Sequence, residues 1–333
     1  MKKKQYFRII TERNSVKRIK NRRNICVYEI FVVLLQRKSL NMAKIGVFDS
    51  GYGGLTILDA IRRELPQYDY LYLGDNARAP YGTHSFDVIY RYTLQAVNFL
   101  LNSDCSLVIL ACNTASAKAL RTIQQNDLPR INAERAEGRR ANGRPANVLG
   151  VIRPTVEAVP NITKTGHVGI LATPATVSSE SYVLELEKIS NALTVVQQAC
   201  PMWVPLIESG EHQHAGADYF VDLYLREILA KDPQIDTLVL GCTHYPLLLS
   251  KISQWIKNNG KRFAAGDIQV ISQGYLEAKS LADYLQRHPE YREHLSTNGT
   301  CSYLTTENAD RFSQSASLFI GSPIQAEHID LSH

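Results

Sequence analysis

Two cysteines stand at matching points of the sequence. Cys112 directly follows the apolar run Leu107–Ala111, and Cys242 directly follows the run Thr237–Gly241. The polar residues that come next are Asn113 and Thr114 in the first case, and Thr243 and His244 in the second. A thiol has an ordinary pKa of about 8.5, so its surroundings can tune it to exchange a proton near neutral pH. The matching contexts indicate a pair of thiols that do acid–base chemistry.

A pair of identical acid–base groups suits the inversion of a stereocentre. One group removes a proton from the carbon and the other delivers a proton from the opposite face, with the roles exchanged in the reverse reaction. A single cysteine at a strand end would more simply be a packing residue. The repeated context favours chemistry for Cys112 and Cys242. The cysteines without that context are expected to be structural or incidental: Cys26, Cys105, Cys200 and Cys301.

Short apolar runs alternate with segments of helical length from Lys44 onward, which is typical of a parallel α/β sheet. The expected strands are Ile45–Phe48, Tyr70–Leu73, Leu107–Ala111, Val148–Ile152, Val168–Leu171, Leu193–Val196, Thr237–Gly241 and Ile268–Ile271. The expected amphipathic helices are Phe86–Leu101, Ser178–Ile189, Asp218–Leu229 and Tyr275–Arg287. The segment Pro129–Asn147 is rich in Arg, Gly and Asn, which predicts a surface insertion.

The two halves of the chain repeat one another. The segment Ile45–Ser50 ahead of Cys112 resembles Val168–Thr173 ahead of Cys242. We therefore expect two pseudo-symmetric α/β domains, each a mostly parallel sheet flanked by helices. The expected division gives residues 1–41 to an extension, 42–147 to the first domain with a return of the chain over roughly 265–333, and 148–264 to the second domain. Ligands of such sheets bind beyond the carboxyl ends of the strands, so both cysteines should face one cleft between the domains.

The charge of the chain is concentrated at its start. Residues 1–41 hold 12 Lys and Arg against two Glu, a charge of +10, so the other 292 residues carry +5 − 10 = −5. This mildly acidic body does not favour nucleic-acid binding. Residues 1–41 are expected to be a disordered or over-called extension, since Met42 directly precedes the first strand and the apolar run Ile25–Leu35 is too short to span a bilayer. No Cys-x-x-Cys pattern occurs, which favours a reducing compartment over a disulfide scaffold or a zinc site.

Four motifs, in order and spacing, resemble those of the glutamate racemases of bacterial cell-wall synthesis. They are Phe48–Leu55, Gly74–Gly82, Ala111–Ser116 and Gly241–Pro246, within a resemblance from about Ile45 to Ala282. That family has the aspartate/glutamate racemase fold of two pseudo-symmetric α/β domains. The resemblance implies a cytoplasmic homodimer that interconverts L-glutamate and D-glutamate without a cofactor and supplies D-glutamate for peptidoglycan synthesis. Neither a metal, a nucleic acid nor a membrane is implied.

The resemblance also implies roles for individual residues. Cys112 would act on D-glutamate and Cys242 on L-glutamate, each as base in one direction and acid in the other. The residues implied to assist the thiols are Asp49, Asp75, Glu208 and His244. The residues implied to contact the substrate are Asp49, Ser50, Pro80, Tyr81, Gly82, Asn113, Thr114, Thr173, Thr176, Thr243 and His244. Taken alone, Thr176 would equally serve as the N-cap of a helix.

Other functions compete with this hypothesis. An aspartate or hydantoin racemase of the same fold would share the thiol pair and differ in its pocket. A thiol hydrolase built on a cysteine and His244 would need one essential cysteine, and a binding protein for an acidic amino acid would need neither. A complete Gly-x-Gly-x-x-Gly pattern and a P-loop are both missing, so nothing suggests a nicotinamide cofactor or a bound nucleoside triphosphate. The extension over 1–41 and the insertion Arg130–Asn147 depart from the family pattern.

Overall fold

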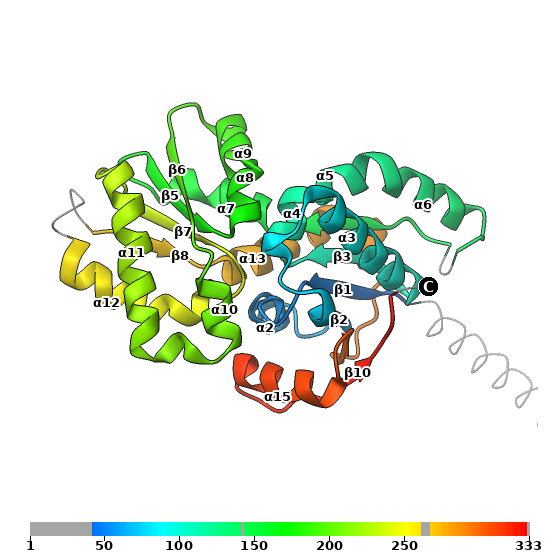
Figure 1. Cartoon of the computed structure of the whole chain (residues 1–333). Coiled ribbons are helices and arrows are strands. Elements are labelled where there is room, and N and C mark those ends of the chain that lie inside the picture. Colours follow the sequence, from blue (N-terminus) through cyan, green and yellow to red (C-terminus); the bar gives the residue numbers. More distant parts are fainter. Residues whose placement is uncertain (1–41, 141–142, 261–266, 332–333) are drawn as a thin grey trace, which may run out of the picture. The chain divides into compact units, whose positions relative to one another are not determined.

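Two parallel sheets with helices on their faces form the core of the computed structural model, which describes residues 42–140, 143–260 and 267–331 (Figure 1). The first sheet has the strand order β10-β9-β2-β1-β3-β4 and the second has the order β6-β5-β7-β8. The strands are β1 (Lys44–Asp49), β2 (Tyr70–Gly74), β3 (Cys105–Leu110), β4 (Asn147–Gly150), β5 (His167–Ala172), β6 (Thr194–Ala199), β7 (Thr237–Gly241), β8 (Gln269–Ile271), β9 (Cys301–Thr305) and β10 (Ala326–His328). The extension expected over residues 1–41 lies outside the described residues.

The strand order repeats between the two sheets. The order β2-β1-β3-β4 in the first sheet corresponds to β6-β5-β7-β8 in the second, and every pairing is parallel. The central strands β1, β3, β5 and β7 are almost continuously buried, as expected for apolar runs covered on both faces. The α/β fold with two parallel sheets is therefore confirmed.

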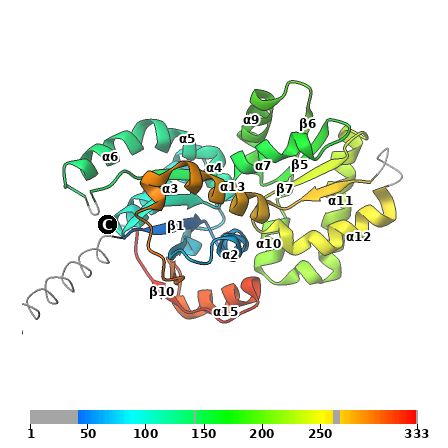
Figure 2. The ribbon, with the colours of Figure 1, turned by 180° about the vertical axis from the view of Figure 1, so that it is seen from behind.

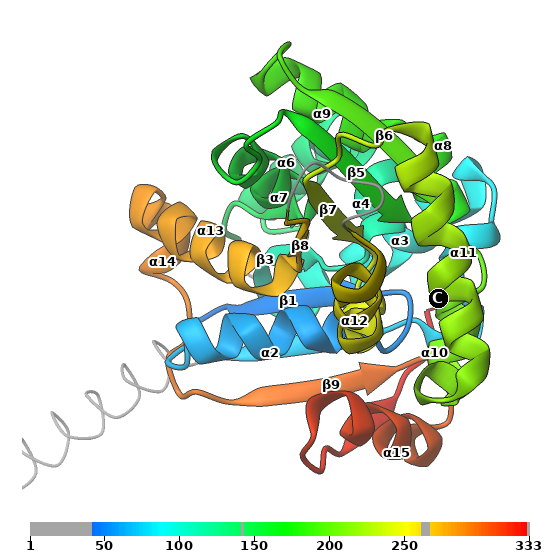
Figure 3. The same cartoon turned by 90° about the vertical axis from the view of Figure 1, so that its left-hand side faces the viewer.

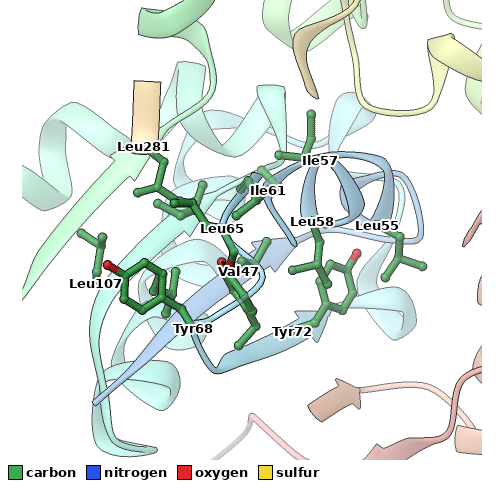
Figure 4. Packing of buried hydrophobic residues seen from close by; sticks show 14 of the residues in the cluster. Val47, Leu55, Ile57, Leu58, Ile61, Leu65, Tyr68, Tyr72, Leu107 and Leu281 are labelled. Atoms are coloured by element: carbon green, nitrogen blue, oxygen red, sulfur yellow. Dashed lines mark hydrogen bonds between the residues drawn. The ribbon is translucent and has the colours of Figure 1, made fainter. Parts of the chain in front are cut away.

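Helices cover both faces of the sheets. They are α2 (Gly54–Glu64), α3 (Phe86–Asn102), α4 (Asn113–Lys118), α5 (Leu120–Thr122), α6 (Leu128–Ala136), α7 (Ile152–Ala158), α8 (Pro174–Ser178), α9 (Ser181–Ile189), α10 (Trp203–Glu208), α11 (Ala215–Lys231), α12 (Leu249–Asn259), α13 (Gln273–Arg287), α14 (Pro289–Arg292) and α15 (Ala309–Ile320). On α2, Leu55, Leu58 and Ile61 recur every third residue and are buried. They join Val47 of β1 and Leu281 of α13 in one apolar cluster (Figure 4).

Helix α13 connects the two sheets. It begins directly after β8 of the second sheet and packs along α2, which covers the first sheet (Figure 3). From behind, α13 is seen between the two sets of strands (Figure 2). The chain then enters β9 and β10, which extend the first sheet beside β2.

Some elements differ from the sequence-based expectation. All eight expected strands are present, but β9 and β10 were not anticipated. The domain boundaries expected at residues 148 and 265 do not coincide with the division between the sheets. Most of β4 is expected in the second domain, but it pairs with β3 of the first sheet. Strand β8 is expected in the first domain, but it pairs with β7 of the second sheet. The helix expected over Ser178–Ile189 is interrupted, because Glu180 adopts a left-handed conformation with a φ of 53° between α8 and α9.

The segment Pro129–Asn147, expected to be a surface insertion, is largely exposed over residues 129–140, but its first part is helical and is anchored by a buried side chain. Residues there form α6, and the side chain of Arg135 is fully buried. Its guanidinium donates to the carbonyl oxygens of Leu101 at 2.9 Å, Cys105 at 3.4 Å and Arg144 at 2.6 Å. A buried guanidinium needs such acceptors, and here they come from the end of α3 and the start of β3. Arg135 therefore anchors a segment in which other arginines, such as Arg130 and Arg139, are exposed.

Across the part of the chain that the structure describes, no helix combines the length and the apolar character that crossing a membrane requires.

Candidate active site

Each cysteine lies just beyond the third strand of its sheet in sequence order, and both face one cavity. Cys112 follows β3 and is the N-cap of α4, while Cys242 follows β7. They are 5% and 6% exposed. The cavity is lined from both halves of the chain by Ser50, Pro80, Tyr81, Gly82, Thr83, Cys112, Asn113, Thr114, Thr173, Pro174, Cys200, Pro201, Val204, Pro205, Glu208, Cys242, Thr243 and His244. The repeat therefore brings the two thiols into a shared site.

Cys112 has an environment that favours the protonated thiol. Burial, followed by the nearby charge of Asp49, raises its pKa to about 12. The Ser50 hydroxyl oxygen lies 3.4 Å from the Cys112 sulfur, and the backbone N–H of Ala115 donates to that sulfur at 3.5 Å. These two contacts lower the pKa but do not offset the burial.

Cys242 faces a histidine–carboxylate pair. His244 Nδ1 lies 3.9 Å from the Cys242 sulfur, and His244 Nε2 lies 3.0 Å from Glu208 Oε1. Burial on its own would lower the pKa of His244, but its contacts with Cys242 and Glu208 outweigh burial and raise that pKa. A protonated imidazole beside a thiol stabilises the thiolate. The two thiols therefore have unlike partners, one a hydroxyl and one a cation.

Gly53, in the first half of the chain, packs closely against Thr243 and His244 in the second half. A Cβ atom on Gly53 would lie 2.3 Å from Thr243 Oγ1 and 2.5 Å from His244 Nδ1. Gly53 has an ordinary helical φ of −59°, so space and not backbone strain requires the glycine. The turn before α2 consequently sets the position of the residues that follow Cys242.

Asp49 lies behind the cavity wall. Its carboxylate accepts from the Gly51 N–H at 2.9 Å and from Thr243 Oγ1 at 3.4 Å. Burial raises the pKa of Asp49, although the charge of His244 acts in the opposite direction. The carboxylate thus links the turn after β1 with the residue after Cys242. Ser50, its neighbour, does line the cavity.

Asp75 supports the cavity wall through Tyr81. Its carboxylate accepts from the Tyr81 hydroxyl, from Arg78 Nε at 2.7 Å and from Thr306 Oγ1 at 2.8 Å. These bonds go to residues other than Cys112, which Asp75 was expected to assist. The neighbouring Gly82 packs against the second half, since a Cβ there would lie 2.9 Å from the Cβ of Thr173.

Three threonine hydroxyls form a cluster across the cavity. Thr114 Oγ1 lies 3.0 Å from Thr173 Oγ1 and 3.4 Å from Thr176 Oγ1, and the latter two are 3.0 Å apart. Thr173 caps α8 by accepting from the backbone N–H of Thr176 at 3.3 Å. The cap is therefore Thr173, and the alternative that assigned it to Thr176 is wrong. Thr176 itself is fully buried behind Thr173 and Thr114.

Several residues of the site carried no signal in the sequence. Cys200, which was taken as structural or incidental, lines the cavity, as do Pro174 and Val204. Tyr182 and Gln273 hydrogen-bond the side chain of Asn113 from outside the cavity. Pro174 directly follows the predicted residue Thr173, whereas the others stand beside no motif and reach the site only through the fold. Within the described residues, no group of three or more His, Cys, Asp and Glu side chains is arranged to hold a metal ion.

Fold and site together define a two-domain α/β protein in which each half supplies one thiol to a common cavity. Residues 53–271 match the family model described as Asp/Glu/Hydantoin racemase, and the chain belongs to this family. It is accordingly an amino-acid racemase, which is an isomerase.

Curated relatives and solved structures are similar over most of their length. The chain is 40% identical to a glutamate racemase of Ruegeria sp. (strain TM1040), over 85% of this chain and 98% of the relative. It is 38% identical to a glutamate racemase of Persephonella marina, over 86% and 97%. The structure of glutamate racemase isoform RacE1 from Bacillus anthracis is similar with a TM-score of 0.73 and 31% identity, over 87% and 98%. A glutamate racemase from Francisella tularensis in complex with D-glutamate also has a TM-score of 0.73, with 29% identity over 88% and 99%.

Proposed function

We propose that the protein interconverts L-glutamate and D-glutamate by proton transfer between two thiols. The observation that carries the proposal is that Cys112 and Cys242 line one cavity from matching strand ends of two repeated sheets. The relatives named as glutamate racemases, and the D-glutamate in the Francisella tularensis structure, support glutamate as the substrate.

The reaction requires a thiolate on one face of Cα and a thiol on the other. With L-glutamate, the Cys242 sulfur takes the α-proton, so the Cα–H bond breaks and an S–H bond forms. Cys112 then gives its proton to the opposite face of Cα. With D-glutamate the roles are exchanged. The unequal environments support this assignment of roles, because the His244 imidazole, whose pKa is raised, faces the Cys242 sulfur, whereas burial raises the pKa of the Cys112 thiol.

The cavity offers donors for the charge that develops during proton transfer. When the α-proton leaves, negative charge spreads into the α-carboxylate, and hydrogen-bond donors around it stabilise the transition state. Asn113, Thr114 and Thr243 stand next to the two thiols and line the cavity. We assign the α-carboxylate and ammonium to these residues, and the side-chain carboxylate of glutamate to the loop at Tyr81 and Gly82.

Deuterium incorporation tests the proposal. L- and D-glutamate would be supplied in deuterated buffer without a cofactor, and optical rotation and α-deuterium would both be followed. The wild type should interconvert the enantiomers with deuterium at Cα, while Cys112→Ser and Cys242→Ser should each abolish net racemisation. Cys301→Ser is the matched control, since this cysteine is outside the cavity.

Two outcomes contradict the proposal. Retention of full racemisation by either cavity variant would exclude the two-thiol mechanism. Inert glutamate, with aspartate or hydantoins turned over instead, would exclude the substrate and keep the mechanism.

The cellular role follows the same reasoning. We propose that the product D-glutamate is used in peptidoglycan synthesis in the cytoplasm, as the resemblance to the glutamate racemases of bacterial cell-wall synthesis implies. The homodimer implied by the family resemblance stays a prediction, and light scattering of the full chain measures it.

A further inference from the structure

Three buried polar side chains form a closed ring of hydrogen bonds behind the cavity. Asn113 Nδ2 donates to Gln273 Oε1 at 2.6 Å, and Gln273 Nε2 donates to the Tyr182 hydroxyl at 2.9 Å. That hydroxyl donates to Asn113 Oδ1 at 2.7 Å. Each of the three residues is at most 2% exposed, and of the three Asn113 alone lines the cavity. The ring therefore ties a residue of the cavity wall to two residues that do not line the cavity.

A backbone carbonyl fixes the direction of the hydrogen bonds in the ring. Gln273 Nε2 also lies 3.2 Å from the Val151 carbonyl oxygen and 3.0 Å from Thr155 Oγ1, so its two N–H groups are shared among three acceptors. A carbonyl oxygen can only accept, so the NH₂ group of Gln273 must face Val151 and its oxygen must face Asn113. Asn113 must then turn its own NH₂ group to Gln273 and its oxygen to Tyr182. A flipped Asn113 amide would set two oxygens against each other.

This orientation leaves Asn113, which lines the cavity, with one N–H that has no acceptor in the described part of the chain. A carboxamide has two N–H donors, and Gln273 accepts one of them. Among residues 42–140, 143–260 and 267–331, no second side chain or carbonyl accepts from Asn113 Nδ2. Asn113 stands next to Cys112, so its second N–H is available to an acceptor held beside that thiol. A reversed amide would present an oxygen there and repel a carboxylate.

We propose that Gln273 and Tyr182 are positioning residues, which hold the Asn113 carboxamide so that its second N–H meets the α-carboxylate of the substrate beside Cys112. This role rests on the proposed function, because it takes an amino-acid carboxylate as the acceptor. The ring draws on both halves of the chain: Asn113 begins α4 after β3, Tyr182 belongs to α9, and Gln273 begins α13 after β8. Docking of the two halves thereby sets the orientation of Asn113.

The test is a double-mutant cycle in racemisation. Tyr182→Phe removes the hydroxyl that holds Asn113 Oδ1 and changes little else, so kcat/KM should fall about tenfold with either enantiomer. Asn113→Ala should cost at least as much. Adding Tyr182→Phe to Asn113→Ala should cost nothing further, because Tyr182 acts through Asn113. Tyr70→Phe is the matched control: its buried hydroxyl donates to the Leu65 carbonyl at 2.7 Å, away from the cavity, and its loss should leave kcat/KM unchanged.

A second variant and the wild type complete the design. Gln273→Met keeps an unbranched side chain without the amide and should show the same non-additivity with Asn113→Ala. If this variant fails to fold, Tyr182→Phe alone decides. An unchanged kcat/KM in Tyr182→Phe overturns the positioning role. So does a loss of kcat/KM on Tyr182→Phe that is equally large in the wild type and in Asn113→Ala. An inactive wild type would instead overturn the proposed function, and the positioning role with it, so the two failures are distinguishable.

Discussion

Gly53 leaves no room for a side chain against the two residues that follow Cys242. Because a Cβ there would lie 2.3 Å from Thr243 Oγ1 and 2.5 Å from His244 Nδ1, Gly53→Ala must displace these side chains from their positions beside Cys242. Misplacing a group that acts on the reacting atoms by about 1 Å can cost about 100-fold. We therefore expect kcat/KM in Gly53→Ala to fall by about this factor, measured with L-glutamate.

Gly216→Ala is the control for that substitution. Gly216 also lies in an early helical turn, in α11, but a Cβ there meets no atom within 4 Å. Its replacement should leave kcat/KM unchanged. Full activity in Gly53→Ala would mean that His244 can shift without affecting the thiol, and the role given to His244 would be lost.

The Glu208–His244 pair predicts a change in pH dependence. Glu208 lies 3.0 Å from His244 and helps to raise the pKa of the imidazole, so Glu208→Gln should lower that pKa. The His244 imidazole then loses its proton at a lower pH than in the wild type. If it stabilises the Cys242 thiolate, the alkaline limb of kcat/KM for L-glutamate should move down by about one pH unit. An alkaline limb that stays in place would contradict the assignment.

For individual residues, the sequence predicts those site residues that directly follow a strand, and it misses those that other segments of the chain bring to the site. Cys112 and Cys242 and the polar residues after them are adjacent to apolar runs, so the fold rule for parallel sheets places them. Tyr182 and Gln273 are far from either cysteine in sequence, and their hydrogen bonds depend on how helices dock. Asp75 shows the same limit, since its partners Tyr81 and Thr306 come from separate segments.

Among the elements, α13 carries a buried carboxyl that predicts a pH-dependent stability. Glu277 is 2% exposed, its Oε2 has no hydrogen-bond partner, and burial raises its pKa from 4.5 to about 7. The folded state thus binds a proton that the unfolded state releases between these pH values. Stability should fall by about 3 kcal/mol as the pH rises from 4.5 to 7 and stay lower above it.

Glu277→Gln removes this titration without changing the size of the side chain. Its free energy of unfolding in urea should match the wild type near pH 5 and exceed it near pH 8. Glu187→Gln, on the exposed face of α9, is the control and should show no such difference. An equal effect of Glu277→Gln at both pH values would mean that the carboxyl is neutral or paired throughout.

The elements also show where composition misleads. Strand β10 has three residues, Ala326–His328, with no apolar alternation, so its pairing with β9 depends on the sheet that is already there. Helix α6 is rich in charged residues yet buries Ile131 and Arg135. Periodicity finds elements with a long apolar face, and it misses those whose backbone or charges are satisfied by distant partners.

For the molecule as a whole, the internal repeat was the strongest signal. It predicted two sheets and a shared site, and the equal strand orders β2-β1-β3-β4 and β6-β5-β7-β8 agree with it. The addition of β9 and β10 to the first sheet breaks the symmetry and could not be predicted from the repeat, because no counterpart exists in the second sheet. The two halves are thus alike in the order of the strands that lead to the thiols, and unlike at the edge formed by β9 and β10.

This distribution predicts unequal effects of shortening the chain at its two ends. In the part of the chain that the structure describes, which starts at Met42, residues form both sheets and line the cavity, so a variant that begins at Met42 should keep kcat/KM and its unfolding temperature. A variant that ends at Gly321 loses β10, the Ile329 N–H bond to the Thr305 carbonyl and the buried Leu331. Leu331 alone should cost on the order of 2 kcal/mol, so this variant should unfold at a lower temperature in calorimetry. Loss of activity in the Met42 variant, with its unfolding temperature unchanged, would show that the basic extension takes part in catalysis or assembly.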